Sequence, residues 1–200
     1  MCIRDRRIVV IASALHDRLF DQRAVNLDLE ADPSYLGFTT KEVGMLEGWM
    51  AYARSKLANV MSAAGQADEL AQQGITCVSV HPGVDTTTEL FRAQRIGGWI
   101  MRNLPLNPIG VQTTWQSVQT TLHCTLTEHA ALTPGGFYSQ YYKSLYRDGE
   151  SGGWPMKSPN PLVNATDCAT LVRLSREAVG LEKRAALEVA ETPSTVIGLS

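Results

Sequence analysis

A tyrosine and a lysine lie four residues apart in the segment Tyr52-Ala-Arg-Ser-Lys56. On a helix this spacing places both side chains on one face, about one turn apart, so that they can interact. An ammonium fixed beside a phenol favours the phenolate form, which can exchange a proton with an alcohol or a carbonyl oxygen. The spacing alone also fits an ordinary exposed pair on a helix, so it has to be read together with its surroundings.

A serine stands at the end of a short apolar run rich in β-branched residues. The run predicts a buried strand over Arg7–Ser13. Open α/β sheets bind ligands at the carboxyl ends of their strands, where the Ser13 hydroxyl is placed to donate to a developing oxyanion. The alternative role for a serine after a strand is a turn or a helix cap.

The elements around these residues alternate between strand and helix patterns. A long loop is predicted from Ala14 to about Glu47, and apolar residues at three- and four-residue steps predict one helix over about Trp49–Gln73. Among the residues on its apolar face are Leu57, Met61 and Ala71. Gly74 is predicted to end the helix in a positive-φ conformation, before a buried strand over Ile75–Val80. Strand, helix and strand in this order predict a right-handed crossover in a parallel sheet.

The second half of the chain adds a predicted lid and three further elements. Residues 84–110 are predicted to form a substrate lid in which Phe91 and Trp99 line an apolar pocket, and Trp115 is predicted to be a packing residue. The further elements are a helix over Val111–Leu126, a strand over Gly135–Tyr138 and a terminal helix over Ala165–Leu181.

Composition and charge exclude several classes of protein. Two hundred residues, of which 44% are hydrophobic, predict one core and one domain. A net charge of -2 with scattered charges provides no basic stripe, so nucleic acid is not expected as a partner. No apolar run reaches the roughly 18 residues of a membrane span. The single, widely spaced cysteines predict core residues in a reducing compartment, with no metal site and no disulfide framework.

Four motifs occur in the order found in the short-chain dehydrogenase/reductase family, which the chain resembles from Arg7 to about Leu181. Within that family it looks most like the retinol dehydrogenase and protochlorophyllide reductase branches. The motifs are Arg7-Ile-Val-Val-Ile-Ala-Ser13-Ala-Leu-His16, Tyr52-Ala-Arg-Ser-Lys56-Leu-Ala-Asn59, Gly74-Ile-Thr-Cys-Val-Ser-Val-His81-Pro82-Gly83 and Thr87-Thr-Glu-Leu90.

The resemblance implies an oxidoreductase that transfers a hydride between a nicotinamide cofactor and a small hydrophobic alcohol or carbonyl compound. Tyr52 would be the general acid/base and Ser13 would orient the substrate carbonyl. Lys56 would favour the phenolate and hold the nicotinamide ribose. The cofactor would be NADP or NAD, with NADP favoured by the resemblance only.

The resemblance also implies cofactor contacts beyond the second strand. Pro82 and Gly83 would shape the loop beneath the nicotinamide, and Thr87 would contact its carboxamide or the phosphates. His16 and His81 stand where this branch commonly has histidine, and we expect both to be structural or pocket-wall residues.

The glycine-rich phosphate-binding turn of the family's first half does not occur in the sequence. The expected fold class is therefore α/β, the C-terminal part of a doubly wound parallel-sheet Rossmann fold whose first βαβ units are missing. Residues 1–6 are expected to be a non-native start, 7–181 the catalytic part of one domain, and 182–200 a tail.

Such a fragment is expected to be inactive alone. The intact protein is expected in the cytoplasm or facing it, with an anchor or transit segment possible upstream, and a homo-oligomer is compatible with the sequence. Two other functions stay open. One is a nucleotide-sugar epimerase-type enzyme, and the other is a non-catalytic family member that acts as a binding or regulatory scaffold.

Overall fold

The computed structural model describes residues 6–17, 25–29, 45–83, 113–139 and 160–181. Within these ranges three strands form one parallel sheet in the order β1-β2-β3. The strands are β1 (Arg6–Ile11), β2 (Ile75–Val80) and β3 (Phe137–Tyr138). The predicted α/β class with a parallel sheet is confirmed.

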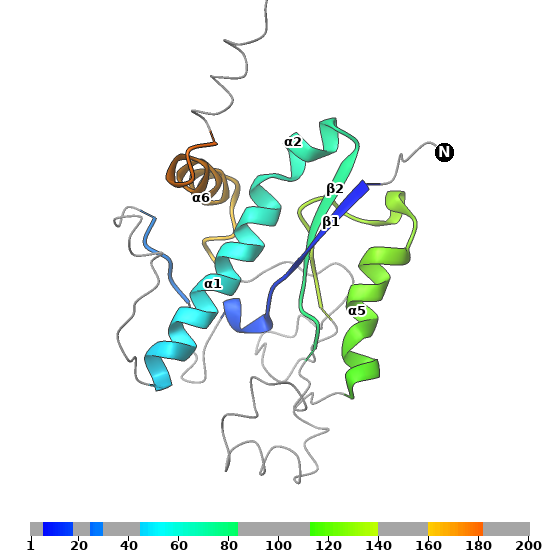
Figure 1. The fold of residues 1–200 in the computed structure, drawn as a ribbon, viewed down its shortest axis with the longest axis horizontal. Helices are drawn as coiled ribbons and strands as arrows, with labels where there is room; N and C mark the ends of the chain where they lie inside the picture. The colour runs from blue at the N-terminus through cyan, green and yellow to red at the C-terminus, as the bar shows by residue number, and fades with distance from the viewer. Residues whose placement is uncertain (1–5, 18–24, 30–44, 84–112, 140–159, 182–200) are drawn as a thin grey trace, which may run out of the picture.

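Helices cover both faces of this sheet. In Figure 1, α1 lies on one side of the strands and α5 on the other, and α6 packs on the outer side of α1. The layers therefore run from α6 through α1 and the sheet to α5. The helices are α1 (Met45–Gly65), α2 (Ala67–Gln72), α5 (Thr114–Leu126) and α6 (Ala165–Ala178), and the 3-10 turns are η1 (Ala14–His16) and η4 (His129–Ala131).

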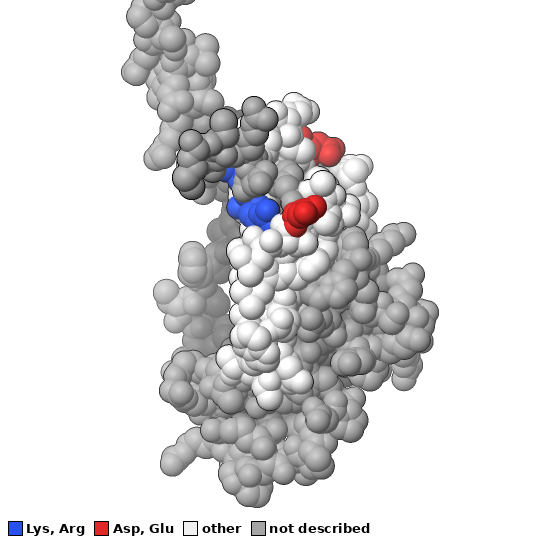
Figure 2. All heavy atoms as spheres, turned by 90° about the vertical axis from the view of Figure 1, so that its right-hand side faces the viewer, with Lys and Arg blue, Asp and Glu red and all other residues white. Residues whose placement is uncertain are grey.

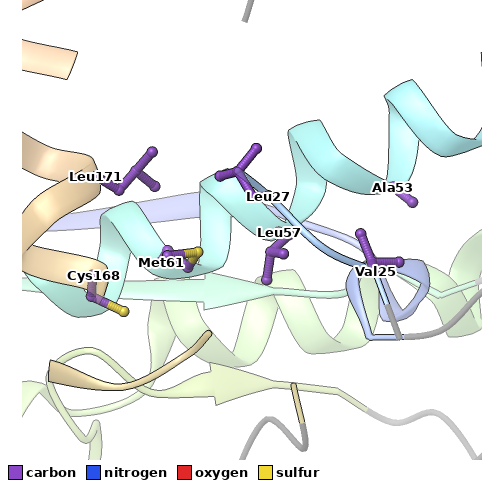
Figure 3. Close-up of a cluster of buried hydrophobic side chains, with 7 residues drawn as sticks. All are labelled: Val25, Leu27, Ala53, Leu57, Met61, Cys168 and Leu171. Carbon is purple, nitrogen blue, oxygen red and sulfur yellow. The ribbon is translucent and has the colours of Figure 1, made fainter. Parts of the chain in front are cut away.

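The core is divided between the two faces of the sheet. One cluster joins α1, α6 and the segment 25–29 (Figure 3), and another joins β2, β3 and α5. A third, small cluster of Ala12, Val60 and Phe137 joins α1 to the sheet, and burial of such apolar side chains is the main force that packs these layers together. Cys77, Cys124 and Cys168 are buried, as predicted. The first cluster contains Val25, Leu27, Ala53, Leu57, Met61, Cys168 and Leu171.

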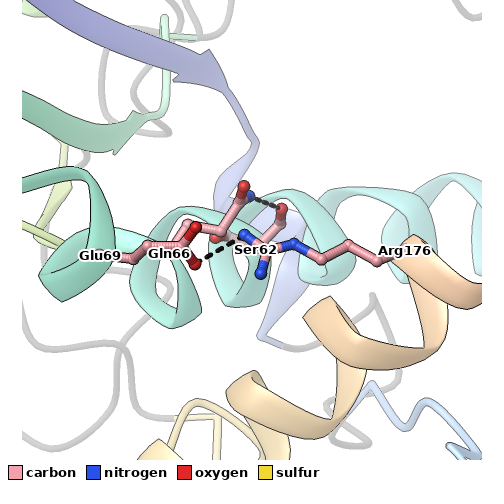
Figure 4. A network of polar contacts seen from close by, with 4 residues as sticks. All are labelled: Ser62, Gln66, Glu69 and Arg176. Carbon is pink, nitrogen blue, oxygen red and sulfur yellow. Dashed lines mark hydrogen bonds and ion pairs between the residues drawn. The ribbon is translucent and has the colours of Figure 1, made fainter. Parts of the chain in front are cut away.

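The single long helix predicted up to Gln73 is two helices, interrupted at one residue. The Gln66 amide donates to the carbonyl of Ser62 at 3.2 Å and to its hydroxyl at 2.8 Å (Figure 4). The backbone N–H of Gln66 also donates to the Ser62 carbonyl, at 3.2 Å, so the interruption is confined to this residue. The prediction for Ala71 is wrong, because after the interruption Ala71 is exposed and Ala67 is buried.

An ion pair links the end of α6 to α2. Arg176 donates to Glu69 at 2.7 Å, and both side chains are partly exposed (Figure 4). Exposed pairs of this kind contribute little free energy, about 0 to 1 kcal/mol. The packing of α6 therefore depends mainly on its apolar face.

The first strand is shifted from its predicted range. It begins at Arg6 and ends at Ile11. The N–H of Ala12 still donates to the Val80 carbonyl at 2.7 Å. Ser13 lies beyond the strand and caps η1, because its side chain accepts from a backbone N–H of that turn. Ser13 was predicted to be the last residue of the strand. It lies instead in the turn that follows the strand, at the same edge of the sheet.

Local signals set the other helix ends. Gly74 has a φ of 69°, which confirms its predicted role after the helix. Helix α5 begins at Thr114, later than predicted, because Thr113 and Gln116 form a reciprocal capping box. Gly180, with a φ of 68°, follows α6. Trp115 is 71% exposed, so its prediction as a packing residue is wrong.

Candidate active site

Three segments meet at the carboxyl edge of the sheet. The carboxyl end of β1 leads to Ser13 and η1, beside α1 (Figure 1). The parallel neighbour β2 leads into His81-Pro82-Gly83 at the same edge. Helix α1 carries Tyr52 and Lys56. The edge at which open parallel sheets bind ligands is therefore where the predicted catalytic segments come together.

Tyr52 and Lys56 are neighbours on α1. The Lys56 Nζ atom lies 5.5 Å from the centroid of the Tyr52 ring, within the range of a cation–π contact. The Trp49 ring meets the Tyr52 ring edge-on, with the ring centroids 6.0 Å apart. The same Nζ donates to the carbonyl of Ile11 at 3.2 Å. The phenol ring is thus held between an indole and an ammonium, and the ammonium is tied to the end of β1.

Ser13 is buried and begins η1. Its Oγ accepts from the N–H of Leu15 at 3.3 Å, so it occupies the helix-cap role that was the alternative for this serine. A hydroxyl that accepts in this way still has its own hydrogen to donate. Ser13 follows the strand-end residue Ile11, to which Lys56 is bound, by two positions.

The two buried histidines at this edge are neutral. Burial lowers the pKa of His16 to about 4, although the hydrogen bond from its Nδ1 to the Ser13 carbonyl, at 2.6 Å, acts in the opposite direction. Burial, and then the proximity of His16, lowers the pKa of His81 to about 3. The His16 ring meets the ring of Phe137 edge-on, with the centroids 4.7 Å apart. This environment suits structural residues better than residues that exchange protons at neutral pH.

The predicted cofactor loop is described only in its first part. Gly83 has a φ of 94°, a conformation that favours glycine, and it presents backbone without a Cβ after β2. Pro82, just before it, is partly buried. Thr87, Phe91 and Trp99 lie outside the described residues, so their roles stay predictions.

Asn59 is a residue that the sequence reasoning did not select for the site. Its side-chain amide donates to the Ile11 carbonyl at 3.0 Å, the same oxygen that accepts from Lys56. The sequence spacing could have indicated this residue, because Asn59 follows Lys56 by three positions and so shares its helix face.

Asn160 is a second residue that the sequence did not reveal. The residue is 2% exposed, and its side-chain amide donates to the carbonyls of His16 at 3.0 Å and Val25 at 2.9 Å. Its Oδ1 accepts from the N–H of Leu162 at 3.0 Å. A single side chain therefore joins η1, the segment 25–29 and the approach to α6. Its two acceptors lie far away in the sequence, so no local pattern predicts them.

The charged side chains of the described residues on the face that carries α5 lie together. Figure 2 shows them towards one end of this face, and the other described residues in view are uncharged. Helix α5 itself contains no Asp, Glu, Lys or Arg.

In the part of the chain that the structure describes, no cluster of three or more His, Cys, Asp or Glu is arranged to hold a metal ion. Within the same residues, no helix has the length and apolar character needed to cross a bilayer.

No protein-family model matches the chain. Individual curated proteins do. Dehydrogenase/reductase SDR family member 13 of Bos taurus is 33% identical over 137 residues, 66% of this chain and 32% of that protein. Retinol dehydrogenase 12 of Bos taurus is 34% identical over 118 residues, 58% of this chain and 32% of that protein. Retinol dehydrogenase 11 of Homo sapiens is 37% identical over 90 residues, 45% of this chain and 27% of that protein.

One solved structure has a similar fold. An uncharacterized protein from Mycobacterium Paratuberculosis aligns with a TM-score of 0.50 and 22% identity, over 88% of this chain and 50% of that chain. The similarity supports the fold assignment alone. The chain thus spans about half of its structural neighbour and matches about a third of its curated relatives.

Proposed function

Because the chain is a relative of the short-chain dehydrogenase/reductase family, on its retinol dehydrogenase side, we propose that the protein is an oxidoreductase of that type. It would transfer a hydride between NADP(H) or NAD(H) and a hydrophobic alcohol or carbonyl compound. The observation that carries the proposal is the Lys56 ammonium, 5.5 Å from the Tyr52 ring centroid and tied to the strand end that precedes Ser13.

The proposed chemistry assigns one task to each of the three side chains. In alcohol oxidation, the O–H bond of the substrate breaks and its proton passes to the phenolate oxygen of Tyr52. In carbonyl reduction, the phenol returns that proton to the substrate oxygen. Ser13 donates its hydroxyl hydrogen to the substrate oxygen and orients it. Lys56 stabilises the phenolate through its positive charge.

The residues at this edge suit a nicotinamide ribose. An ammonium has three N–H donors, and one of those of Lys56 is used by the Ile11 carbonyl. Two donors remain for ribose hydroxyls, next to the Tyr52 phenol. Gly83, with its positive φ and no Cβ, permits close approach of backbone to a flat ring, and Pro82 and Thr87 would complete the contacts. When bound, the nicotinamide supplies the hydride acceptor or donor.

The substrate assignment rests on the relatives and on the lid prediction. Two of the similar proteins are named retinol dehydrogenases, so a long apolar alcohol is the substrate class to test first. Phe91 and Trp99 would line the apolar pocket. The thiols of Cys77, Cys124 and Cys168 form no disulfide, which suits a reducing compartment such as the cytoplasm or a surface facing it.

The chain as given is proposed to be one part of the active unit. Residues 7–181 would be the catalytic part of one Rossmann-type domain, and 182–200 a tail. Because the curated relatives extend well beyond the matched stretch, we expect activity only when the cofactor-binding half is present and none from residues 1–200 alone.

Turnover measured with the protein expressed from its complete gene tests the proposal. Retinol and a long aliphatic alcohol would be offered with NADP and with NAD, and formation of the reduced nicotinamide followed by absorbance. We expect turnover with at least one pair. Nicotinamide binding without turnover would favour the scaffold alternative, and interconversion of a nucleotide sugar without net nicotinamide reduction would favour the epimerase. Either result would overturn the proposal.

A further inference from the structure

The carbonyl oxygen of Ile11 is the point at which α1 is fastened to the end of β1. The C=O of Ile11 and the N–H of Ala12 belong to one trans peptide group and point in opposite directions, and this N–H donates to the Val80 carbonyl of β2 at 2.7 Å. The Ile11 carbonyl therefore faces away from β2. It accepts instead from two side chains of α1, Lys56 Nζ at 3.2 Å and Asn59 Nδ2 at 3.0 Å.

Two donors share this one acceptor. A carbonyl oxygen has two lone pairs, and the two side chains that use them lie three positions apart on the same helix face. With one lone pair occupied by the Asn59 amide, the Lys56 ammonium is confined to the other. The confined position is the one that leaves Nζ 5.5 Å from the Tyr52 ring centroid.

Apolar packing of α1 does not by itself set the distance between Lys56 and Tyr52. Leu57 and Val60, each next to one of the two donors in the sequence, are fully buried and fix the helix in the core. Apolar contacts of this kind have no direction, whereas a hydrogen bond sets both a distance and an angle. The Asn59 amide also has no charge to lose, so its contact with Ile11 is the same at every pH at which the protein is folded.

We propose that Asn59 is a positioning residue. Through the Ile11 carbonyl it fixes the distance between α1 and the end of β1, and so holds Lys56 near Tyr52, beside the strand end that precedes Ser13. The inference rests on the proposed function for its catalytic consequence. The contact itself does not, because it is a property of the folded chain.

The catalytic consequence is tested in the protein expressed from its complete gene. Asn59→Leu keeps the bulk and removes the donor, and Asn59→Gln keeps a donor. We expect kcat of the Leu variant to fall about tenfold, since small displacements of reacting groups are costly. The Michaelis constant for the alcohol should change less than kcat, because the displaced groups act at the reacting oxygen. The Gln variant should recover most of the loss.

Ser62→Ala is the matched control, since it removes a side-chain hydrogen bond from the same helix, to Gln66, away from the sheet edge. It should leave kcat and KM unchanged. A merely structural role of Asn59 would lower the folded fraction of the Leu variant and leave kcat per folded molecule as in the wild type. That result would overturn the inference.

An activity-independent measurement separates this inference from the proposed function. The acetylation rate of Lys56, followed by mass spectrometry with the other lysines as internal references, reports how firmly its ammonium is held. In Asn59→Leu we expect the rate to rise about fivefold, the equivalent of one net hydrogen bond. An unchanged rate would refute the positioning role even in an active enzyme. A raised rate in a protein without turnover would refute only the proposed function.

Discussion

A β-carbon added to Gly65 would lie 2.6 Å from the carbonyl oxygen of Cys168. At this point α1 and α6 meet backbone against backbone, and the Cγ2 atom of Val172 would be 2.9 Å from the same added carbon. The glycine is thus required by the close approach of two helices. This contact places α6 on α1, the helix that carries Tyr52 and Lys56.

Gly65→Ala should therefore destabilise the protein by about 2 to 3 kcal/mol, because α6 must move away from α1 to admit the methyl group. The free energy of unfolding from urea denaturation measures the effect. Gly74→Ala is the matched control: its φ of 69° is strained for alanine, but nothing lies within 4 Å of the added carbon. It should cost about 1 kcal/mol. Equal losses in the two variants would contradict the helix contact.

Asn160→Leu should be among the most destabilising single changes in the described chain. It removes both donors from the buried carbonyls of His16 and Val25, which would leave those oxygens unsatisfied. We expect a loss of roughly 2 to 4 kcal/mol in the free energy of unfolding. Asn164→Ala, which removes the N-cap of α6, should cost only about 1 kcal/mol. Comparable melting temperatures for the two variants would show that the Asn160 bridge contributes little.

Acid should destabilise the fold through its buried histidines. The folded pKa of His16 is about 4 and that of His81 about 3, both below the ordinary value of 6.5. Between these values the unfolded chain binds more protons than the folded one, so stability is complete above pH 6.5 and falls as the pH decreases. His16 alone would account for roughly 3 kcal/mol of this loss by about pH 4.

The histidine contribution is isolated by His16→Gln, which cannot titrate. Urea denaturation at a series of pH values should show a shallower decline for this variant than for the wild type between pH 6.5 and about pH 4. Parallel curves for the two proteins would exclude His16 as a source of the acid sensitivity.

The sequence predicted those parts of the fold that depend on local patterns. The strand Ile75–Val80 was predicted with its observed bounds, because a short, mainly apolar run after a glycine indicates a buried strand, and five of its six residues are buried in the structure. The parallel crossover and the buried cysteines also followed from local patterns. Several helix and strand ends differ from the predicted ones by a few residues. At these boundaries, capping residues such as Thr113 and Ser13 decide where an element begins, and apolar periodicity does not reveal them.

Features that depend on distant contacts could not be predicted. The interruption at Gln66 falls inside a continuous helical pattern, and the role of Asn160 depends on acceptors 144 and 135 residues away. At the candidate site, the pairing of Tyr52 with Lys56 follows from helical spacing. The shared attachment of Lys56 and Asn59 to Ile11 does not, since it requires knowing how closely α1 approaches the strand end.

The measurement that bears most directly on the central claim is kcat of Tyr52→Phe in the protein expressed from its complete gene. Tyr138→Phe is the control, because its buried hydroxyl accepts from the N–H of Thr133 at 2.8 Å and so serves the fold. If Tyr52 transfers the substrate proton, its variant should lose a factor of about 10² to 10⁴ in kcat at an unchanged melting temperature. The Tyr138 variant should lose stability and keep kcat per folded molecule. Wild-type kcat in Tyr52→Phe would contradict the account.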